Sequence, residues 1–322
     1  MIPPNYGEPT NPYGVGVPAR LQSGERGTVL PLFGDAHVHL GLVDPEALPV
    51  GGIGRVLDLG WSLNEIDKWV SEGIPGLEID YVGNFLSAPK GYPSDRSWAP
   101  ADATMFVSDP QLAIQTQILF NVDAIKITLN AEAGPVHSDL ILQELVEGAL
   151  EQGRIPIIHA EGPGQALRAI HSSLVVLAHT PFTEVLDDDT IAYAAKHNYG
   201  WISTLDIHGY GNYGEAYEIA CNNLTRFISA GGTVFYGTDL GNGPLPEGIN
   251  VRELKSLLRC GLSAEQLIDS LTAWWDMKPM PIPPEPEPRV SFISDISDTN
   301  TEDVCTWLAL ARIVETTEVE YL

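Results

Sequence analysis

The stretch PLFGDAHVHL, residues 31–40, ends a short apolar run with two histidines. His37 and His39 are two positions apart, and on a strand that spacing puts both imidazoles on one face. Two neutral imidazoles side by side suit a borderline metal such as zinc. Taken alone, the HxH pair is a weak signal, because it is also typical of two hydrogen-bonded histidines near a turn. The fold therefore has to be inferred from the rest of the chain.

Short apolar runs recur along the sequence. Between about residues 32 and 273 they alternate with amphipathic stretches, a pattern typical of repeated βα units and a parallel sheet. The predicted strands are residues 31–40, 54–59, 76–86, 124–129, 155–159, 174–179, 201–205 and 233–239, and the predicted helices are 64–72, 109–120, 138–152, 164–171, 188–197, 214–230, 250–259 and 263–274. This number of strands closes an α/β fold of the (β/α)₈ TIM-barrel type, which usually takes about 250 residues.

The two ends of the chain lack this alternation. Residues 1–30 are rich in Pro and Gly, and we expect an N-terminal arm with at most a short strand. Residues 31–276 form the predicted barrel, and residues 277–290 are a Pro-rich, semi-rigid linker. In the tail, residues 291–322, we predict one docked helix at about residues 302–314.

Composition limits the kind of partner. The formal net charge of −26 disfavours nucleic acid, whose binding depends on Lys and Arg. No apolar run is long enough to span a membrane, and the first residues lack the features of a signal peptide, so we expect a cytoplasmic protein with a small-molecule substrate. Three cysteines without a CxxC pair indicate reduced thiols. A homo-oligomer stays open.

Three further strands end in a polar side chain. His159 ends the run 155–159, His179 ends 174–179, and Asp239 ends 233–239. A buried polar group needs a partner, because burying it unsatisfied is costly. Each residue alone could bond to backbone. Three strands ending alike indicate a shared site at the C-terminal ends of the strands, where barrel active sites lie.

Lys126 lies inside the apolar strand 124–129. Burial lowers the pKa of an ammonium group, and a neutral amine can react with CO₂ to give a carbamate. A carbamate is an anionic oxygen ligand that bridges two metals. The alternative is a Lys paired with a carboxylate such as Glu161 or Asp58, and the sequence leaves both open.

This order of HxH, Lys, His, His and Asp resembles the amidohydrolase superfamily over about residues 31–275. The resemblance is carried by DAHVHLG at 35–41, IKI at 125–127, IHAEG at 158–162, LAHT at 177–180 and YGTD at 236–239. Within the superfamily the chain looks most like the imidazolonepropionase-like group, which includes prolidase-type dipeptidases and amidases.

The resemblance implies a metal-dependent hydrolase that cleaves a C–N bond, amide or peptide-like, with a water activated on one or two divalent ions, Zn²⁺ being expected. Asp239 would also be the general base. The group usually carries a small β-sandwich built from both chain ends, which we expect to be reduced or absent here. The implied ligands are His37, His39 and Asp239 for one ion, His159 and His179 for the other, and carbamylated Lys126 as the bridge.

Other candidates depend on position alone. His208 follows strand seven and could hydrogen-bond the substrate or a developing oxyanion, or be an ordinary loop histidine. Glu161 could support a metal ligand or bind a substrate amine, and Asp58 is a similar supporting candidate. Predicted pocket residues, which could equally pack their loops, are Tyr92, Trp98, Tyr210, Tyr213 and Asn242, and predicted surface histidines are His137, His171 and His197.

Two other functions are compatible with these residues. The same activated water could cleave an ester, lactone or phosphoester, and the ligand set does not separate these reactions from amide hydrolysis. A different class is a non-catalytic barrel that serves as a binding module. Such a protein is expected to have lost ligands, whereas this sequence retains all six positions.

Overall fold

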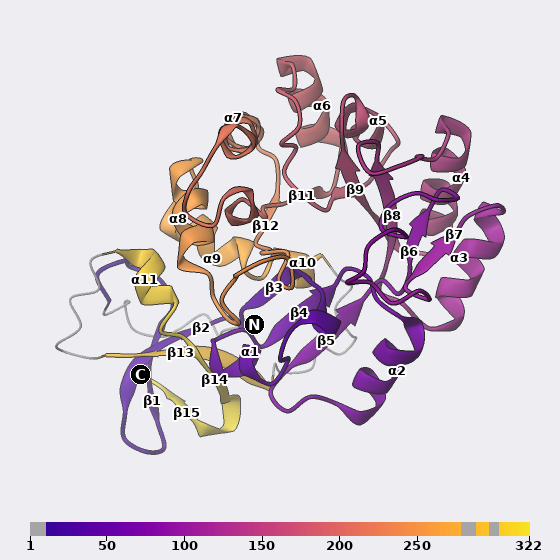
Figure 1. The fold of residues 1–322 in the computed structure, drawn as a ribbon. Coiled ribbons are helices and arrows are strands. Elements are labelled where there is room, and N and C mark those ends of the chain that lie inside the picture. Colours follow the sequence, from indigo (N-terminus) through magenta and orange to yellow (C-terminus); the bar gives the residue numbers. More distant parts are fainter. Residues whose placement is uncertain (1–10, 278–287, 296–302) are drawn as a thin grey trace.

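The computed structural model describes residues 11–277, 288–295 and 303–322. Parallel strands form the centre of the molecule, and helices lie around them (Figure 1). Seven of the strands form one parallel sheet in the spatial order β12-β11-β10-β9-β8-β6-β7. Their bounds are β6 (Phe85–Ser87), β7 (Thr104–Phe106), β8 (Ala124–Asn130), β9 (Ile155–Glu161), β10 (Val176–Leu177), β11 (Gly200–Ile202) and β12 (Val234–Phe235).

A second parallel sheet contains β3 (Gly34–Val38), β4 (Arg55–Asp58) and β5 (Glu78–Tyr81), in that order. Backbone hydrogen bonds join both edge strands of this smaller sheet, β3 and β5, to the larger sheet. The Ala36 N–H donates to Tyr236 O at 2.9 Å, just after β12, and the Asp123 N–H donates to Tyr81 O at 2.8 Å, just before β8. The strands therefore form an α/β arrangement in which β3 is bonded to the segment after β12 and β5 to the segment before β8.

An apolar cluster fills the space between these strands. Most of the parallel strands contribute to it, and Trp274, which lies just after α9 (Ala264–Ser270), also packs in it. Its strand members include Ala36, Leu57, Ala124, Ile157, Val176, Ile202 and Phe235, all of which are almost completely buried. A second, larger cluster lies between the strands and the surrounding helices.

The helices match the predicted ones to within a few residues at most ends. Several begin at a capping residue, such as Asp109, whose side chain accepts from the Leu112 N–H, or Ser263, which forms a capping box with Gln266. The helices that follow the parallel strands are α2 (Leu63–Glu72), α3 (Pro110–Leu119), α4 (Asp139–Glu151), α5 (Gln165–Ile170), α6 (Asp188–His197), α7 (Glu215–Ser229), α8 (Val251–Arg259), α9 (Ala264–Ser270) and α10 (Ala273–Asp276), and α1 (Ala47–Val50) precedes β4.

Both chain ends contribute to a third sheet, so two predictions are wrong: an N-terminal arm with at most a short strand, and a tail whose one regular element is a helix. This five-stranded sheet has the order β14-β13-β2-β1-β15, with antiparallel pairs, and in Figure 1 the indigo and yellow strands lie side by side. In place of the small β-sandwich that the resemblance implies, the two chain ends form a single sheet. Its strands are β1 (Val17–Leu21), β2 (Arg26–Leu30), β13 (Arg289–Ser294), β14 (Arg312–Glu315) and β15 (Val319–Tyr321).

The predicted tail helix is shorter than expected. Helix α11 spans Val304–Leu308, and β14 follows where the prediction continued the helix. Most of the predicted linker lies outside the described residues. The division of the chain into an arm (1–30), a barrel (31–276), a linker (277–290) and a tail (291–322) stays a prediction.

The predicted strand 76–86 is two strands, β5 and β6, because Gly83 adopts a φ of +73° between them. β7 lies between the predicted strand 76–86 and the predicted helix 109–120, where the sequence predicted no strand. Among the helices of the described residues, none combines the length and the apolar content needed to cross a bilayer.

Candidate metal centre

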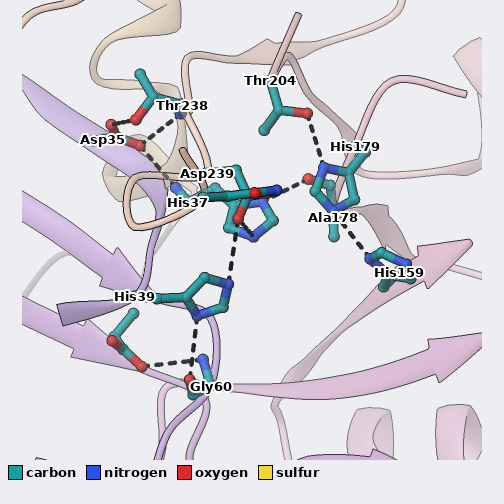
Figure 2. A network of polar contacts seen from close by, with 12 residues as sticks. Asp35, His37, His39, Gly60, His159, Ala178, His179, Thr204, Thr238 and Asp239 are labelled. Atoms are coloured by element: carbon teal, nitrogen blue, oxygen red, sulfur yellow. Dashed lines mark hydrogen bonds and ion pairs between the residues drawn. The ribbon is translucent and has the colours of Figure 1, made fainter. Parts of the chain in front are cut away.

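Polar side chains from β3, β9, and the ends of β10 and β12 converge at one place (Figure 2). His37 Nε2 lies 3.1 Å from Asp239 Oδ1, and His39 Nε2 lies 3.3 Å from the same oxygen. One ligand atom from each of these three residues lies within 4.8 Å of the others. All three side chains are buried.

The other ring nitrogens decide the tautomers. His37 Nδ1 contacts Ala178 O at 2.8 Å, and His39 Nδ1 contacts Gly60 O at 3.2 Å. A carbonyl oxygen only accepts, so each Nδ1 carries the proton and, in a neutral ring, each Nε2 presents a lone pair. Two lone pairs thus face a carboxylate oxygen with no proton between them. A divalent cation fits this donor set, because it satisfies all three atoms at once.

Two buried carboxylates hold β3 and its histidines in place. Asp58 accepts from the Leu40 N–H at 2.8 Å and from the N–H of Gly60 at 3.0 Å, the residue whose carbonyl faces His39. Asp35 accepts from the His37 N–H at 2.9 Å. These carboxylates hold the backbone, whereas the ring orientations of His37 and His39 are fixed by their Nδ1 contacts to Ala178 O and Gly60 O.

Asp239 is fixed from its own side. Its backbone has a φ of +57°, in the left-handed region that non-glycine residues rarely adopt and that recurs at functional sites. Its Oδ2 accepts from Asn242 Nδ2 at 2.9 Å, and the neighbouring Thr238 donates its N–H and its hydroxyl to Asp35. The carboxylate is therefore presented in one orientation to His37 and His39.

A second pair of histidines lies beside this group. His179 Nε2 is 3.0 Å from His159 Nδ1, and the His37 and His179 rings are 4.7 Å apart between centroids. His179 Nδ1 contacts Thr204 Oγ1 at 2.9 Å, and His159 Nε2 contacts Glu161 Oε2 at 3.1 Å. Two ring nitrogens therefore face each other at a distance that one cation can bridge.

Burial makes the histidines poor bases. It lowers the pKa of His37 to about 4, and it lowers the pKa of His159 and, further, that of His179. Burial also raises the pKa of Asp239, but the charges and hydrogen bonds of the surrounding histidines outweigh this and hold it well below its ordinary value. The site therefore presents neutral imidazoles and an ionised carboxylate, the forms that bind metal.

Lys126 is almost completely buried in β8. Burial lowers its pKa to about 7, although the charges of Asp239 and Asp58 oppose the shift. Within the described residues, no ion pair joins Lys126 to Glu161 or Asp58. Both carboxylates have other partners, so the direct pairing considered from the sequence does not occur.

A cavity of about 630 Å³ opens at this site. The loop between β6 and β7 forms one wall, where the Tyr92 ring stacks on that of His159 at 4.9 Å and the Trp98 ring lies 5.9 Å from that of His39. Of the predicted pocket residues, those that line the cavity are Tyr92, Trp98, Glu161 and Asn242, and further lining residues are Asp95, Arg96 and Asn130.

The two other predicted pocket residues do not line this cavity. Tyr213 donates to Asp206 Oδ1 at 2.9 Å and stacks on Tyr217, and Tyr210 donates to Asn242 O at 3.1 Å. Both tyrosines pack the loops behind the site. His208 Nε2 is buried and has no hydrogen-bond partner among the described residues.

One histidine placed on the surface by the sequence is buried. His137 Nε2 contacts Leu86 O at 3.2 Å, because the segment before α4 folds back over β6. The prediction of a surface position is wrong for His137, whereas His171 and His197 are exposed.

Several supporting residues have no sequence signal of their own. Asp35 lies in the motif DAHVHLG, which was interpreted through its two histidines. Asn130 is the last residue of β8, a position similar to that of the ligands in their strands. Asp206 is fully buried and is held by Arg252 and Asn250 from the start of α8. Of Asp35, Asn130 and Asp206, the one that the sequence could have indicated is Asn130, because it is a polar residue at the end of an apolar strand.

No protein-family model matches the chain, and no curated protein sequence matches it. Solved structures match it at low sequence identity. A Xaa-Pro dipeptidase with bound methionine is similar at 18% identity and a TM-score of 0.68, over 92% of this chain and 87% of that one. The ochratoxinase of A. niger has 18% identity and a TM-score of 0.68, over 89% and 82% of the two chains.

A third similar structure is a bottromycin amidohydrolase, with 15% identity and a TM-score of 0.63 over 90% of this chain and 76% of that one. At such identities the likeness concerns the arrangement of the chain in space. That arrangement agrees with the resemblance in the sequence motifs. This protein shares its fold with these solved dipeptidase, ochratoxinase and amidohydrolase structures.

Proposed function

We propose that this protein is a metal-dependent hydrolase that cleaves a C–N bond, amide or peptide-like, in a small molecule. The observation that carries the proposal is the convergence of two imidazole lone pairs on one carboxylate oxygen, in His37, His39 and Asp239. A divalent cation satisfies all three of these ligand atoms at once, which a single proton cannot do. The structurally similar dipeptidase and amidohydrolase are named for hydrolysis of this kind of bond.

The proposed cofactor is Zn²⁺, one or two ions per chain, since neutral imidazoles and carboxylates suit zinc. His37, His39 and Asp239 would hold the first ion, and His159 and His179 the second. We further propose that Lys126 is carbamylated and bridges them. Its neutral amine adds to the carbon of CO₂, the nitrogen loses a proton to solvent, and an N–COO⁻ group results.

We also propose that the two parallel sheets together form a (β/α)₈ barrel, with the site at the C-terminal ends of its strands. The inter-sheet hydrogen bonds at both edges and the enclosed apolar cluster support this closure. Active sites of this fold lie at that face.

A bound divalent ion supplies a water of lowered pKa and polarises the substrate carbonyl. The chain supplies the proton transfers and the positioning. Asp239, ionised and held by Asn242, accepts the proton of the attacking water and returns it to the leaving nitrogen. His208, whose buried Nε2 has no hydrogen-bond partner among the described residues, would donate a hydrogen bond to the substrate carbonyl oxygen as negative charge develops there.

The proposed substrate is a small molecule with an apolar or aromatic group. The cavity of about 630 Å³ is within the range that holds drug-sized molecules. Tyr92 and Trp98 line it with aromatic rings, and the acidic chain disfavours nucleic acid as a partner. A cytoplasmic location and a homo-oligomer stay expectations.

Metal analysis and a substrate panel test the proposal. Zinc-loaded, dialysed protein should retain one or two ions per chain, and it should hydrolyse dipeptides or N-acyl amino acids faster than esters, lactones or phosphoesters. His159→Ala should lose activity, and Asp239→Asn should lose it by a factor of about 10²–10⁴. Exposed His197→Ala and Asp188→Asn are the matched controls.

Different failures have different meanings. An intact protein that retains no metal would contradict the proposal and favour a binding module. Metal uptake with faster hydrolysis of lactones, esters or phosphoesters would move the reaction to those bonds while keeping the site.

A further inference from the structure

Glu161 lies two residues beyond His159 on β9, so both side chains leave the strand on the same face. Its Oε2 is 3.1 Å from His159 Nε2. The same oxygen accepts from Asn130 Nδ2 at 2.5 Å, and Asn130 is the register partner of Glu161 on β8. One carboxylate oxygen is thus shared between a histidine and an amide.

The orientation of the Asn130 amide follows from its other contacts. Its Oδ1 accepts from the Glu132 N–H at 3.1 Å and from the Ala133 N–H at 3.0 Å. Backbone N–H groups only donate, so the oxygen must face them and Nδ2 must face Glu161. This fixed amide holds Glu161 Oε2 against His159.

This contact to Glu161, at 3.1 Å, is shorter than the 3.4 Å between His159 Nε2 and the donor Asn130 Nδ2, and it therefore assigns the tautomer of His159. A carboxylate oxygen accepts, so His159 Nε2 carries the proton and Nδ1 presents the lone pair. Nδ1 is the atom that lies 3.0 Å from His179 Nε2. Without the carboxylate, the ring could protonate Nδ1 instead and turn its lone pair away from His179.

We propose that Glu161, held by Asn130, is a positioning residue that presents His159 Nδ1 to the metal ion bound between His159 and His179. The inference rests on the proposed function, since it needs a metal at this pair. Of the two roles that the sequence left open for Glu161, it selects support of the metal-ligating His159 over binding of a substrate amine. Hydrogen bonds from ligating histidines to a carboxylate typically change metal affinity by about 10–100-fold when removed.

Co²⁺ binding to metal-free protein in the absence of substrate separates these roles. The count of bound ions, their affinities and the visible absorption spectrum are measured for the wild type, Glu161→Ala and Glu161→Gln. Glu161→Gln can keep an oxygen in the place of Oε2, so it tests the charge while retaining both hydrogen bonds. Glu132→Gln, an exposed carboxylate of the same loop region, is the matched control.

We expect Glu161→Ala to lower the affinity for the Co²⁺ ion at His159 and His179 by about 10–100-fold and to change the absorption spectrum of that ion. Binding of the other Co²⁺ ion should be unaffected. Glu161→Gln should lie between the alanine variant and the wild type, and Glu132→Gln should match the wild type. Asn130→Ala should reproduce part of the loss, because Glu161 then loses its fixed partner.

Two results would overturn the inference in different ways. If the wild type binds two ions and both Glu161 variants bind them with the same affinity and spectrum, Glu161 does not position His159, while the hydrolase proposal stands. If the wild type binds no Co²⁺, the proposed function fails and this inference fails with it. Should Glu161→Ala not fold, Glu161→Gln and Asn130→Ala decide the outcome.

Discussion

Asp35 connects the strand that carries two ligands to the turn that carries a third. Its Oδ1 accepts from the backbone N–H groups of His37 and Thr238, and its Oδ2 accepts from the Thr238 hydroxyl. The side chain is 1% exposed, so no solvent can replace these bonds. The carboxylate therefore sets the distance between β3 and Asp239.

We predict that Asp35→Ala lowers the free energy of unfolding by about 2–4 kcal/mol, because two buried N–H groups lose their acceptor. Asp35→Asn should cost about 1 kcal/mol or less, since its oxygen can still accept both N–H bonds and the Thr238 hydroxyl can turn to accept from the amide. Urea unfolding of metal-free protein measures both values. Equal losses in the two variants would contradict this account.

At the level of single residues, the ligands and two of their supports, Glu161 and Asp58, were accessible from sequence, whereas Asp35 and Asn130 were not singled out. His159, His179 and Asp239 each follow an apolar run, and that pattern is visible without a structure. Asp35 and Asn130 act through hydrogen bonds that depend on strand register and on the fold of a following turn. The end of an apolar run marks the position of Asn130, but neither composition nor periodicity predicts the hydrogen bonds that Asn130 and Asp35 make.

The start of helix α8 holds the loop after β11. Glu253 is fully buried and accepts from the Leu205 N–H at 3.0 Å and the Asp206 N–H at 2.7 Å. Burial raises the pKa of Glu253 to about 8, although these hydrogen bonds oppose the shift. The native state therefore favours the protonated side chain, whereas the unfolded chain ionises near its ordinary value of 4.5.

A pH dependence follows from this difference. The stabilisation from neutral Glu253 is fully present below about pH 4.5 and is lost as pH rises toward 8, at a slope of at most about 1.4 kcal/mol per pH unit. We predict that the unfolding free energy of the wild type, minus that of Glu253→Gln, falls between pH 5 and 8 and is flat above. Urea unfolding at several pH values in chelator checks this, and parallel curves for the two proteins would refute it.

Among whole elements, the strands of the parallel sheets were predictable and the small sheet was not. Buried parallel strands are continuous apolar runs, which the sequence displays directly. β13 pairs with β2, whose residues lie at the opposite end of the chain, as in the pair Phe292 and Val29. Such a pairing leaves no local periodic signal, and the short β14 and β15 are interrupted by turns.

The small sheet is attached to the strand that carries the first ligands. β2 leads directly into β3, and Ser291 Oγ on β13 accepts from the Phe33 N–H at 3.0 Å. Phe292 is fully buried between β2 and β14. We infer that the sheet and the parallel strands unfold as one cooperative unit.

We predict that Phe292→Ala lowers the unfolding free energy by about 3–5 kcal/mol, since it removes a buried aromatic ring. Circular dichroism and tryptophan fluorescence should report one coincident transition before and after the change. The control Phe106→Ala, at a 49% exposed position on an edge strand, should change stability by less than about 0.5 kcal/mol. Two separate transitions would show that the ends form an independent unit.

The facing lone pairs of His37, His39 and Asp239 have a consequence for the molecule as a whole. A bound metal ion relieves the electrostatic repulsion among these acceptor atoms, and the unfolded chain offers no such pocket. The melting temperature therefore reports how much of the protein has metal bound. A cation at a hundred times its dissociation constant should stabilise the native state by about 2.7 kcal/mol, and a chelator should remove that gain. Melting curves recorded across a series of divalent salts would therefore rank the preferred ion before any turnover has been observed.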